Sequence, residues 1–177
     1  LSGISVAFLE WNGTNETVNT NKTINSTATE FYTSKSLSAG NYTYRWFAND
    51  TLNNWNVTTI YTYNITQNIS IVSFLRLEFN QTINQNKTYT HPDVINITAW
   101  KTISEGSLTL FRNNTEIVTG QSPNETLILA NATYNYTAFY PSSQNYSSGS
   151  ITYFIFVNRG GVSVSLWLND TADNRTY

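Results

Sequence analysis

The stretch Leu37–Trp46, with the sequence LSAGNYTYRW, carries the clearest structural signal in the chain. From Asn41 onward its polar and aromatic residues alternate, which places Tyr42, Tyr44 and Trp46 on one side of an extended backbone. A β-strand has a side-chain period of two. The pattern therefore predicts a strand that turns three aromatic rings toward a core and its polar residues toward water.

The outward residues of this stretch also form an acceptor sequence for N-linked glycan, Asn-x-Thr, with Asn41 as the acceptor and Thr43 two positions later. Because the two required residues are two apart, a strand places both on the same face. A core-facing residue can then occupy the middle position while the sugar leaves from the outer surface. We therefore expect glycan on the face of a sheet.

The same arrangement recurs in the second half of the chain, where Asn135-Tyr136-Thr137 lies within another alternating stretch. The spacing Leu-x-x-Gly-x-Tyr at 37–42 recurs as Leu-x-x-Ala-x-Tyr at 129–134. This resembles the corner that introduces the sixth strand of immunoglobulin and fibronectin type III sandwiches, where a Tyr hydroxyl bonds back to nearby backbone. For each copy alone, an ordinary half-buried strand is the alternative. Two copies favour an all-β chain of tandem immunoglobulin-like or fibronectin-like β-sandwiches.

The composition excludes several classes of protein. Only 11% of the 177 residues are charged and the net charge is −2, so electrostatic binding of nucleic acid has no support. Polarity comes instead from 25 Asn, 27 Thr and 18 Ser. The chain has no Cys, so its cores must form without disulfides. No stretch reads as a signal peptide or a membrane span, and we interpret the sequence as a mature or internal segment of a secreted protein.

Nineteen acceptor sequences occur in the chain, whereas chance pairing of its Asn with its Ser and Thr gives about six. None has Pro at the middle position, and seventeen end in Thr. A chain that is merely rich in Asn and Thr is the alternative explanation. The predicted N-glycosylation sites are Asn12, Asn15, Asn21, Asn25, Asn41, Asn49, Asn56, Asn64, Asn68, Asn80, Asn86, Asn96, Asn113, Asn124, Asn131, Asn135, Asn145, Asn169 and Asn174.

The middle residues of these acceptor sequences divide into two groups. Eleven are small or polar and lie mostly where turns are expected, whereas the others are apolar or aromatic and lie in strand-like stretches that would bury them. Acceptors on both strands and turns predict a coat over the sheet faces. N-glycosylation also places the chain outside the cytoplasm, in an extracellular or cell-surface location. The apolar group comprises Tyr42, Val57, Ile65, Ile69, Ile97, Ala132, Tyr136 and Tyr146.

Residues 1–67 are interpreted as a first immunoglobulin-like sandwich. This region has fewer strands than the seven of a complete sandwich. We therefore expect that its opening strands either precede residue 1 or come from a neighbouring molecule. The expected strands are 4–11, 31–37, 38–48 and 57–65, with Tyr61, Tyr63 and Ile65 facing the core and 16–30 forming a solvated hairpin or loop.

Residues 68–158 are interpreted as a complete sandwich, because turn signals separate seven short predicted strands. These strands are expected at 71–79, 94–100, 107–112, 116–118, 126–129, 134–140 and 151–157.

Residues 159–177 are interpreted as a linker and the first strand of a further repeat. The segment from Val164 matches the start of the second domain at Leu75. A lone strand is not stable in water. Continuation into a longer array is the simpler interpretation, and insertion into another subunit by strand addition is the more specific one.

The segment Gly40–Ile65, with Trp46, two Asn-rich turns around Trp55 and a closing Tyr-rich strand, resembles the tandem immunoglobulin-like repeats of large archaeal and bacterial surface proteins. The segment from Phe139-Tyr140-Pro141 to Val157 looks like the end of a bacterial immunoglobulin-like repeat. This resemblance implies a stalk, an adhesin, a surface layer or a filament. The fold alone does not decide among these functions.

Catalytic and metal-binding patterns are weak. His91 is the only His, and because the chain has no Cys, it cannot assemble the ligand cluster of a zinc site. A catalytic triad would need His91 as its base, and no Ser lies in the turn that such a nucleophile requires. The 11 acidic residues are scattered and do not form the carboxylate pair of a glycosidase. Residues 169–174 alternate oxygen ligands but lack the Gly and the terminal Glu of a calcium loop. We expect no enzyme activity, no catalytic or metal-binding residues, and no cofactor apart from covalent glycans.

The sequence thus predicts a non-catalytic structural component of a densely N-glycosylated filament, stalk or surface coat, in which immunoglobulin-like domains join end to end or self-associate. The alternative is an adhesin stalk or ligand-binding module. That alternative requires an unglycosylated exposed patch, which we would expect around Trp55 or Trp100.

Overall fold

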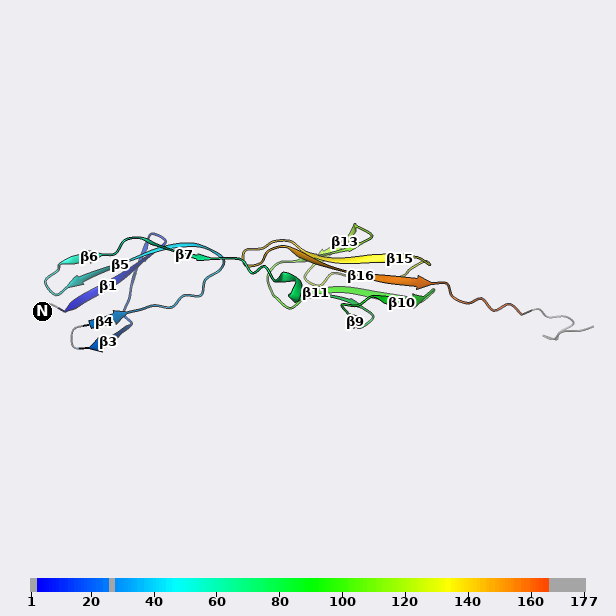
Figure 1. Ribbon diagram of the computed structural model, residues 1–177, viewed down its shortest axis with the longest axis horizontal. Coiled ribbons are helices and arrows are strands. Elements are labelled where there is room, and N and C mark those ends of the chain that lie inside the picture. The colour runs from blue at the N-terminus through cyan, green and yellow to red at the C-terminus, as the bar shows by residue number, and fades with distance from the viewer. Residues whose placement is uncertain (1–2, 26–27, 166–177) are drawn as a thin grey trace, which may run out of the picture. The chain divides into compact units, whose positions relative to one another are not determined.

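The structure, a computed structural model, describes residues 3–25 and 28–165 (Figure 1). Within these ranges the regular elements are β-strands and one short 3-10 helix, η1 (Ile71–Phe74). The expected all-β class is therefore confirmed. The described residues form two compact units, the first made of those up to 69 together with 144–147 and the second of 70–143 together with those from 148 onward.

The second unit contains two sheets. The larger sheet has the strand order β10-β16-β15-β12-β13, and the smaller has the order β14-β11-β8-β9. Neighbouring strands are antiparallel except β10 and β16, which run parallel. The strands are β8 (Leu75–Phe79), β9 (Thr82–Ile83), β10 (Lys87–Thr90), β11 (Val94–Lys101), β12 (Leu108–Arg112), β13 (Thr115–Gly120), β14 (Asn124–Ile128), β15 (Thr133–Tyr140) and β16 (Gly149–Asn158).

The core of the second unit lies between these two sheets. The rings of Phe79, from the smaller sheet, and Tyr136, from the larger, meet edge to face with centroids 5.8 Å apart. Every second residue along β8 is buried, as the period of a strand requires. This is the sandwich that the sequence predicts. Its buried side chains include Leu75, Leu77, Phe79, Ile95, Ile97, Ala99, Leu108, Leu110, Tyr136, Ala138, Tyr140, Ile151, Ile155 and Val157.

Three short elements of the second unit differ from expectation. Residues 71–74 form η1 instead of the start of a strand. Strand β9 has two residues and β10 has four, and neither was expected. Periodicity cannot reveal elements of this length, because two to four residues contain too few alternations. β10 nevertheless completes one edge of the larger sheet through its parallel pairing with β16.

The first unit contains a five-stranded sheet and a two-stranded hairpin, β3-β4. The centre of the sheet is β5 (Gly40–Asp50), which pairs with β1 on one side and with β7 and β6 on the other. The strand predicted from Asn41 to Trp46 is therefore confirmed as the central one (Figure 1). The remaining strands are β1 (Ile4–Trp11), β2 (Thr14–Thr17), β3 (Asn21–Asn25), β4 (Ala28–Phe31), β6 (Trp55–Val57) and β7 (Tyr61–Ile65).

Four expectations for the first unit are wrong. The described residues form seven strands, where fewer were expected, and the strand expected over 57–65 is interrupted between Val57 and Tyr61. The strand expected over 31–37 does not form, because β4 ends at Phe31 and the backbone from 32 to 39 is irregular. Tyr61 and Tyr63 pair with Tyr44 and Tyr42, on the expected face of the sheet, but they are 48% and 52% exposed. The irregular segment covers this face only in part, so both tyrosines keep about half of their surface in contact with solvent. Alternation predicted the face correctly but could not predict its cover.

Both units contain the predicted tyrosine corner. The Tyr42 hydroxyl donates to the Ser38 carbonyl at 2.8 Å, and the Tyr134 hydroxyl donates to the Ala130 carbonyl at 3.1 Å. In each case the acceptor lies four residues before the Tyr, so the bond closes the bend that leads into the strand. Both copies of the Leu-x-x-(Gly/Ala)-x-Tyr spacing therefore form the same hydrogen-bonded corner.

We expect Tyr134→Phe and Tyr42→Phe each to lower the free energy of unfolding by about 0.5–1.5 kcal/mol, the usual net contribution of one intramolecular hydrogen bond. Urea denaturation measures the change. Tyr153→Phe is the matched control, because the Tyr153 hydroxyl has no hydrogen-bond partner within the described residues, and it should change stability by less than about 0.5 kcal/mol. Equal losses in all three variants would contradict the structural role of the corners.

Tyr136 combines complete burial with a polar contact. Its side chain is 0% exposed, and its hydroxyl donates to Glu125 Oε1 at 2.7 Å. Arg112 Nη1 forms an ion pair with the same oxygen, Glu125 Oε1, at 3.2 Å. Burial is the largest cause that raises the pKa of Tyr136 above the usual value, and the hydrogen bond to Glu125 adds to it. The folded protein therefore holds the neutral phenol.

This raised pKa predicts a loss of stability in alkali. The favourable contribution of Tyr136 is complete below the unfolded-state pKa near 10 and declines as the pH rises above it, because only the unfolded chain then releases the proton. The slope should reach about 1.4 kcal/mol per pH unit for this proton. Tyr136→Phe should flatten the decline by that amount in urea titrations between pH 9 and about 11. An unchanged slope would show that Tyr136 ionises normally when folded.

The strand expected after the linker lies mostly outside the described residues. Residues 161–165 have no regular structure, and Val162 and Val164 are exposed. Residues 166–177 lie beyond the described range, so the further repeat stays a prediction.

Candidate functional site

Seventeen of the nineteen predicted glycan acceptors lie within the described residues, and none of these is buried. Asn49, Asn135 and Asn145 are half-buried, whereas Asn169 and Asn174 lie outside the described residues. A glycan on the folded chain requires its acceptor to lie at the surface, and all seventeen residues are at least partly exposed. The exposed acceptors are Asn12, Asn15, Asn21, Asn25, Asn41, Asn56, Asn64, Asn68, Asn80, Asn86, Asn96, Asn113, Asn124 and Asn131.

Three acceptors occupy the first position of a two-residue hairpin turn: Asn12, Asn80 and Asn113. Both turn residues have positive φ in each hairpin, as a type I′ turn requires. Asn tolerates this left-handed conformation better than most residues do. The required Thr is then the first residue of the returning strand. The acceptor sequence and the turn therefore occupy the same residues.

The side-chain amide of each turn Asn is hydrogen-bonded to the strand that lies beside its hairpin. Its Oδ1 accepts a hydrogen bond from a backbone N–H of that strand, and its own backbone N–H donates to the carbonyl of the same partner residue. The side chain thus acts as one more rung of the ladder and has a fixed orientation. The Oδ1 contacts are Asn12 with Thr43 at 2.9 Å, Asn80 with Asn96 at 2.7 Å, and Asn113 with Asn135 at 3.0 Å.

Several acceptors are cross-strand neighbours. Asn41 and Asn64 are register partners on β5 and β7, and the Asn64 amide donates to Asn41 Oδ1. On the smaller sheet of the second unit, Asn96 Nδ2 donates to the hydroxyl of Thr126, which is the Thr of the Asn124 acceptor sequence. Cross-strand neighbours have Cα atoms only about 4.5–5.5 Å apart. Sugars on such pairs would leave the sheet side by side.

The apolar middle residues are buried only in part as expected. Ile97 and Tyr136 are fully buried, and Tyr42, Ile65 and Tyr146 are half-buried. The prediction is wrong for three others, Val57, Ile69 and Ala132, which are exposed. Val57 lies on β6, an edge strand of the partly covered sheet, and the other two lie outside strands, where no alternation applies.

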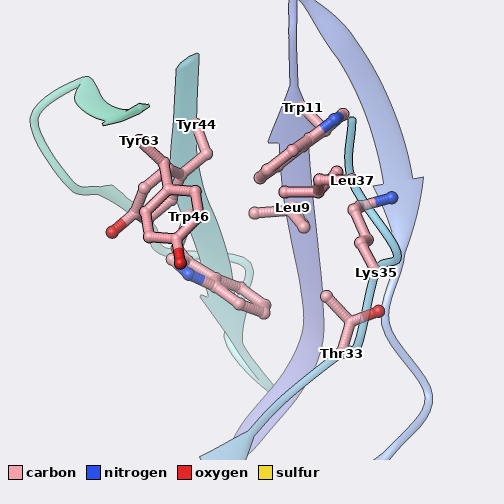
Figure 2. A pocket seen from close by; sticks show the side chains of 8 residues that line it. All are labelled: Leu9, Trp11, Thr33, Lys35, Leu37, Tyr44, Trp46 and Tyr63. Atoms are coloured by element: carbon pink, nitrogen blue, oxygen red, sulfur yellow. The ribbon is translucent and has the colours of Figure 1, made fainter. Parts of the chain in front are cut away.

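A cavity of about 250 Å³ opens on the partly covered face of the first unit. Figure 2 shows Tyr44, Trp46 and Tyr63 on one side of it and Leu9, Trp11 and the irregular segment on the other. The strands supply the aromatic rings because alternation turns them to one face. The irregular segment supplies Thr33, Lys35 and Leu37.

Lys35 holds the irregular segment to the sheet. Its ammonium lies 2.7 Å from Glu16 Oε2 and 5.2 Å from the centre of the Trp11 ring. The ion pair and the cation–π contact both tie Lys35 to strands β1 and β2. The segment is thus positioned by side-chain contacts at one rim of the cavity. No sequence pattern pointed to this cation, since Lys35 lies in a stretch that was expected to be a strand.

The two tryptophans expected in a binding patch lie elsewhere. Trp55 is 53% exposed and stacks on Phe8 with ring centroids 5.8 Å apart. Trp100 is half-buried, with the Arg76 guanidinium 6.0 Å from its ring. Neither lines the cavity, which uses Trp11 and Trp46. Trp46 was expected in a core, but it is half-buried and lines the cavity, because alternation does not show how completely a face is covered.

Catalytic groups do not converge in the described part of the chain. No group of three or more His, Cys, Asp or Glu side chains that could hold a metal occurs there. His91 is exposed, and its Nδ1 lies 3.1 Å from the Leu129 carbonyl. Within the described residues, no helix is long and apolar enough to span a bilayer.

Comparison with solved structures finds a likeness to fibronectin-type modules. The chain is similar to a structure described as fibronectin(III)-like modules of Clostridium thermocellum CbhA, with 12% sequence identity, over 89% of this chain and 80% of that chain, and a TM-score of 0.37. No protein-family model and no curated protein matches the chain. A TM-score this low carries no argument, so the sandwich assignment rests on the two facing sheets and the tyrosine corners.

Proposed function

We propose that this chain is a non-catalytic structural component of an extracellular, densely N-glycosylated filament, stalk or surface coat, built from immunoglobulin-like domains joined end to end. The observation that carries the proposal is the placement of the acceptors: all seventeen described ones reach the surface, and they lie on strands as well as turns. A coat of this density solvates a chain in which only 11% of residues are charged.

The acceptors on the second unit occupy both sheets. Asn96 and Asn124 lie on the smaller sheet, while Asn135 lies on the larger one and Asn113 on the turn at its edge. Sugars on both outer faces would prevent other proteins from packing against them. Association would then use the ends of the domains, which favours a linear assembly over a lateral one.

The first unit offers a surface for such an end-to-end contact. The face that carries Tyr42, Tyr44 and Trp46 is only partly covered, and the side chains of Tyr61 and Tyr63 on that face are about half exposed. Exposed aromatic patches of this kind mark interaction sites. A strand from a neighbouring copy, added at an edge, would extend this sheet, whereas covering the exposed rings requires a neighbouring copy to pack on the face itself.

A ligand-binding module is the second candidate, and the cavity beside Trp11 and Trp46 is the observation that favours it. Four aromatic rings and one cation around about 250 Å³ would suit a small ligand. The two candidates differ in whether the cavity is open in the assembled protein.

Site-resolved mass spectrometry of the native protein tests the coat. We expect glycan on most of the nineteen acceptors, including the strand acceptors Asn41, Asn96 and Asn135. Asn53 and Asn158 are internal controls, because they are exposed but lack the acceptor sequence and should be unmodified. Bare strand acceptors would contradict the proposal and leave the sheet faces open to partners.

Binding of the dye anilinonaphthalene sulfonate, compared between isolated subunits and assembled material, separates the two candidates. If a neighbour covers the cavity, the dye should bind isolated subunits and not the assembly. Trp46→Ala should weaken binding to subunits, whereas Trp55→Ala, which changes a ring outside the cavity, should not. Equal binding to both forms would favour the ligand-binding module.

A further inference from the structure

Two exposed aromatic side chains lie together on the outer face of the larger sheet in the second unit. Phe154 and Phe156, both on β16, are each 39% exposed, and their rings stack with centroids 6.4 Å apart. They point away from the core, because Ile155 and Val157 of the same strand are buried. Covering the two rings would remove apolar surface from water, which is favourable.

Glycan acceptors flank Phe154 on both sides. Its register partner on β15 is the acceptor Asn135, and its backbone N–H donates to Oδ1 of the acceptor Asn86 at 2.9 Å. Asn135 in turn donates its backbone N–H to Asn113, a third acceptor. These four residues therefore lie in one row across the sheet, in the order Asn113, Asn135, Phe154 and Asn86.

Phe156 has a similar setting one step along the strand. Its register partners are Thr133 on β15 and Thr88 on β10. These are the required Thr residues of the acceptor sequences of Asn131 and Asn86. Every cross-strand neighbour of the phenylalanine pair thus belongs to an acceptor sequence.

The Asn135 side chain is also restricted. It is half-buried, and its Oδ1 is buried without a hydrogen-bond partner, whereas its Nδ2 forms no hydrogen bond within the described residues. Nδ2 is the atom that a sugar would modify. Because Asn135 and Phe154 are register partners on the same face, a sugar on Nδ2 would start beside the Phe154 ring.

We propose that the first sugars on Asn86 and Asn135 lie against Phe154 and Phe156, so that the glycan forms part of the packing of this domain. Pyranose rings present a face of C–H groups that packs on aromatic rings, and this contact removes apolar area from water. The inference rests on the proposed glycosylation. A second protein molecule is a less suitable occupant, because sugars on the flanking acceptors would stand between it and the rings.

The test compares Phe154→Thr with a matched control, Phe139→Thr. Phe139 lies on the same face and is 36% exposed, but its register partners are Thr109 and Ser150, which belong to no acceptor sequence. Both variants are made in the full chain, with glycan and in a host without N-glycosylation. Phe154→Thr should lower the melting temperature of the glycosylated form by about 4 °C more than that of the bare form. Phe139→Thr should lower both forms equally.

Two further measurements keep the outcomes distinct. If the bare chain does not fold, the Asn86→Gln, Asn135→Gln double variant replaces it, and in that background Phe154→Thr should lose its extra effect. Nuclear Overhauser contacts between Phe154 ring protons and sugar protons, sought in the unaltered glycoprotein, should be present. Bare Asn86 and Asn135 in mass spectra would refute the glycosylation itself. Occupied sites with equal losses in both forms and no such contacts would overturn only the packing of sugar on the rings.

Discussion

The spacing of the glycan acceptor sequence connects the fold of this chain with its proposed coat. Asn and Thr must lie two residues apart, and a β-strand repeats every two residues, so a strand places both on the outer face. Two-residue hairpin turns satisfy the same spacing, as at Asn12, Asn80 and Asn113. Their side-chain oxygens then accept from the neighbouring strand. The same residues can therefore build the sheets and carry the sugars.

This constraint also explains how a chain with so few charges could remain separate from its neighbours. Core residues such as Ile97 and Tyr136 occupy the middle positions of acceptor sequences, so sugars would leave from directly above the buried core. The outer faces of the second unit would be closed in this way. The aromatic face of the first unit carries exposed rings instead, which makes it the natural place for contact in an end-to-end assembly.

The sequence predicted what alternation and turn chemistry determine. It predicted the central strand β5, the two tyrosine corners and the sandwich of the second unit. It did not predict β9 and β10, which are too short for a period to appear. It also failed for Tyr61, Tyr63 and the cavity, because alternation identifies the face of a side chain but not what covers that face. Cover depends on contacts between distant segments, such as that of Lys35 with Trp11.

Electron cryo-microscopy of the native protein in its assembled form tests the central claim most directly, because it reports the proposed assembly and its coat together. The proposal predicts domains connected end to end, with additional density extending from the turn acceptors and from Asn96 and Asn135 on the sheet faces. Within the first unit, the aromatic face should be covered by a neighbouring subunit. Separate molecules with bare sheet faces would contradict the account.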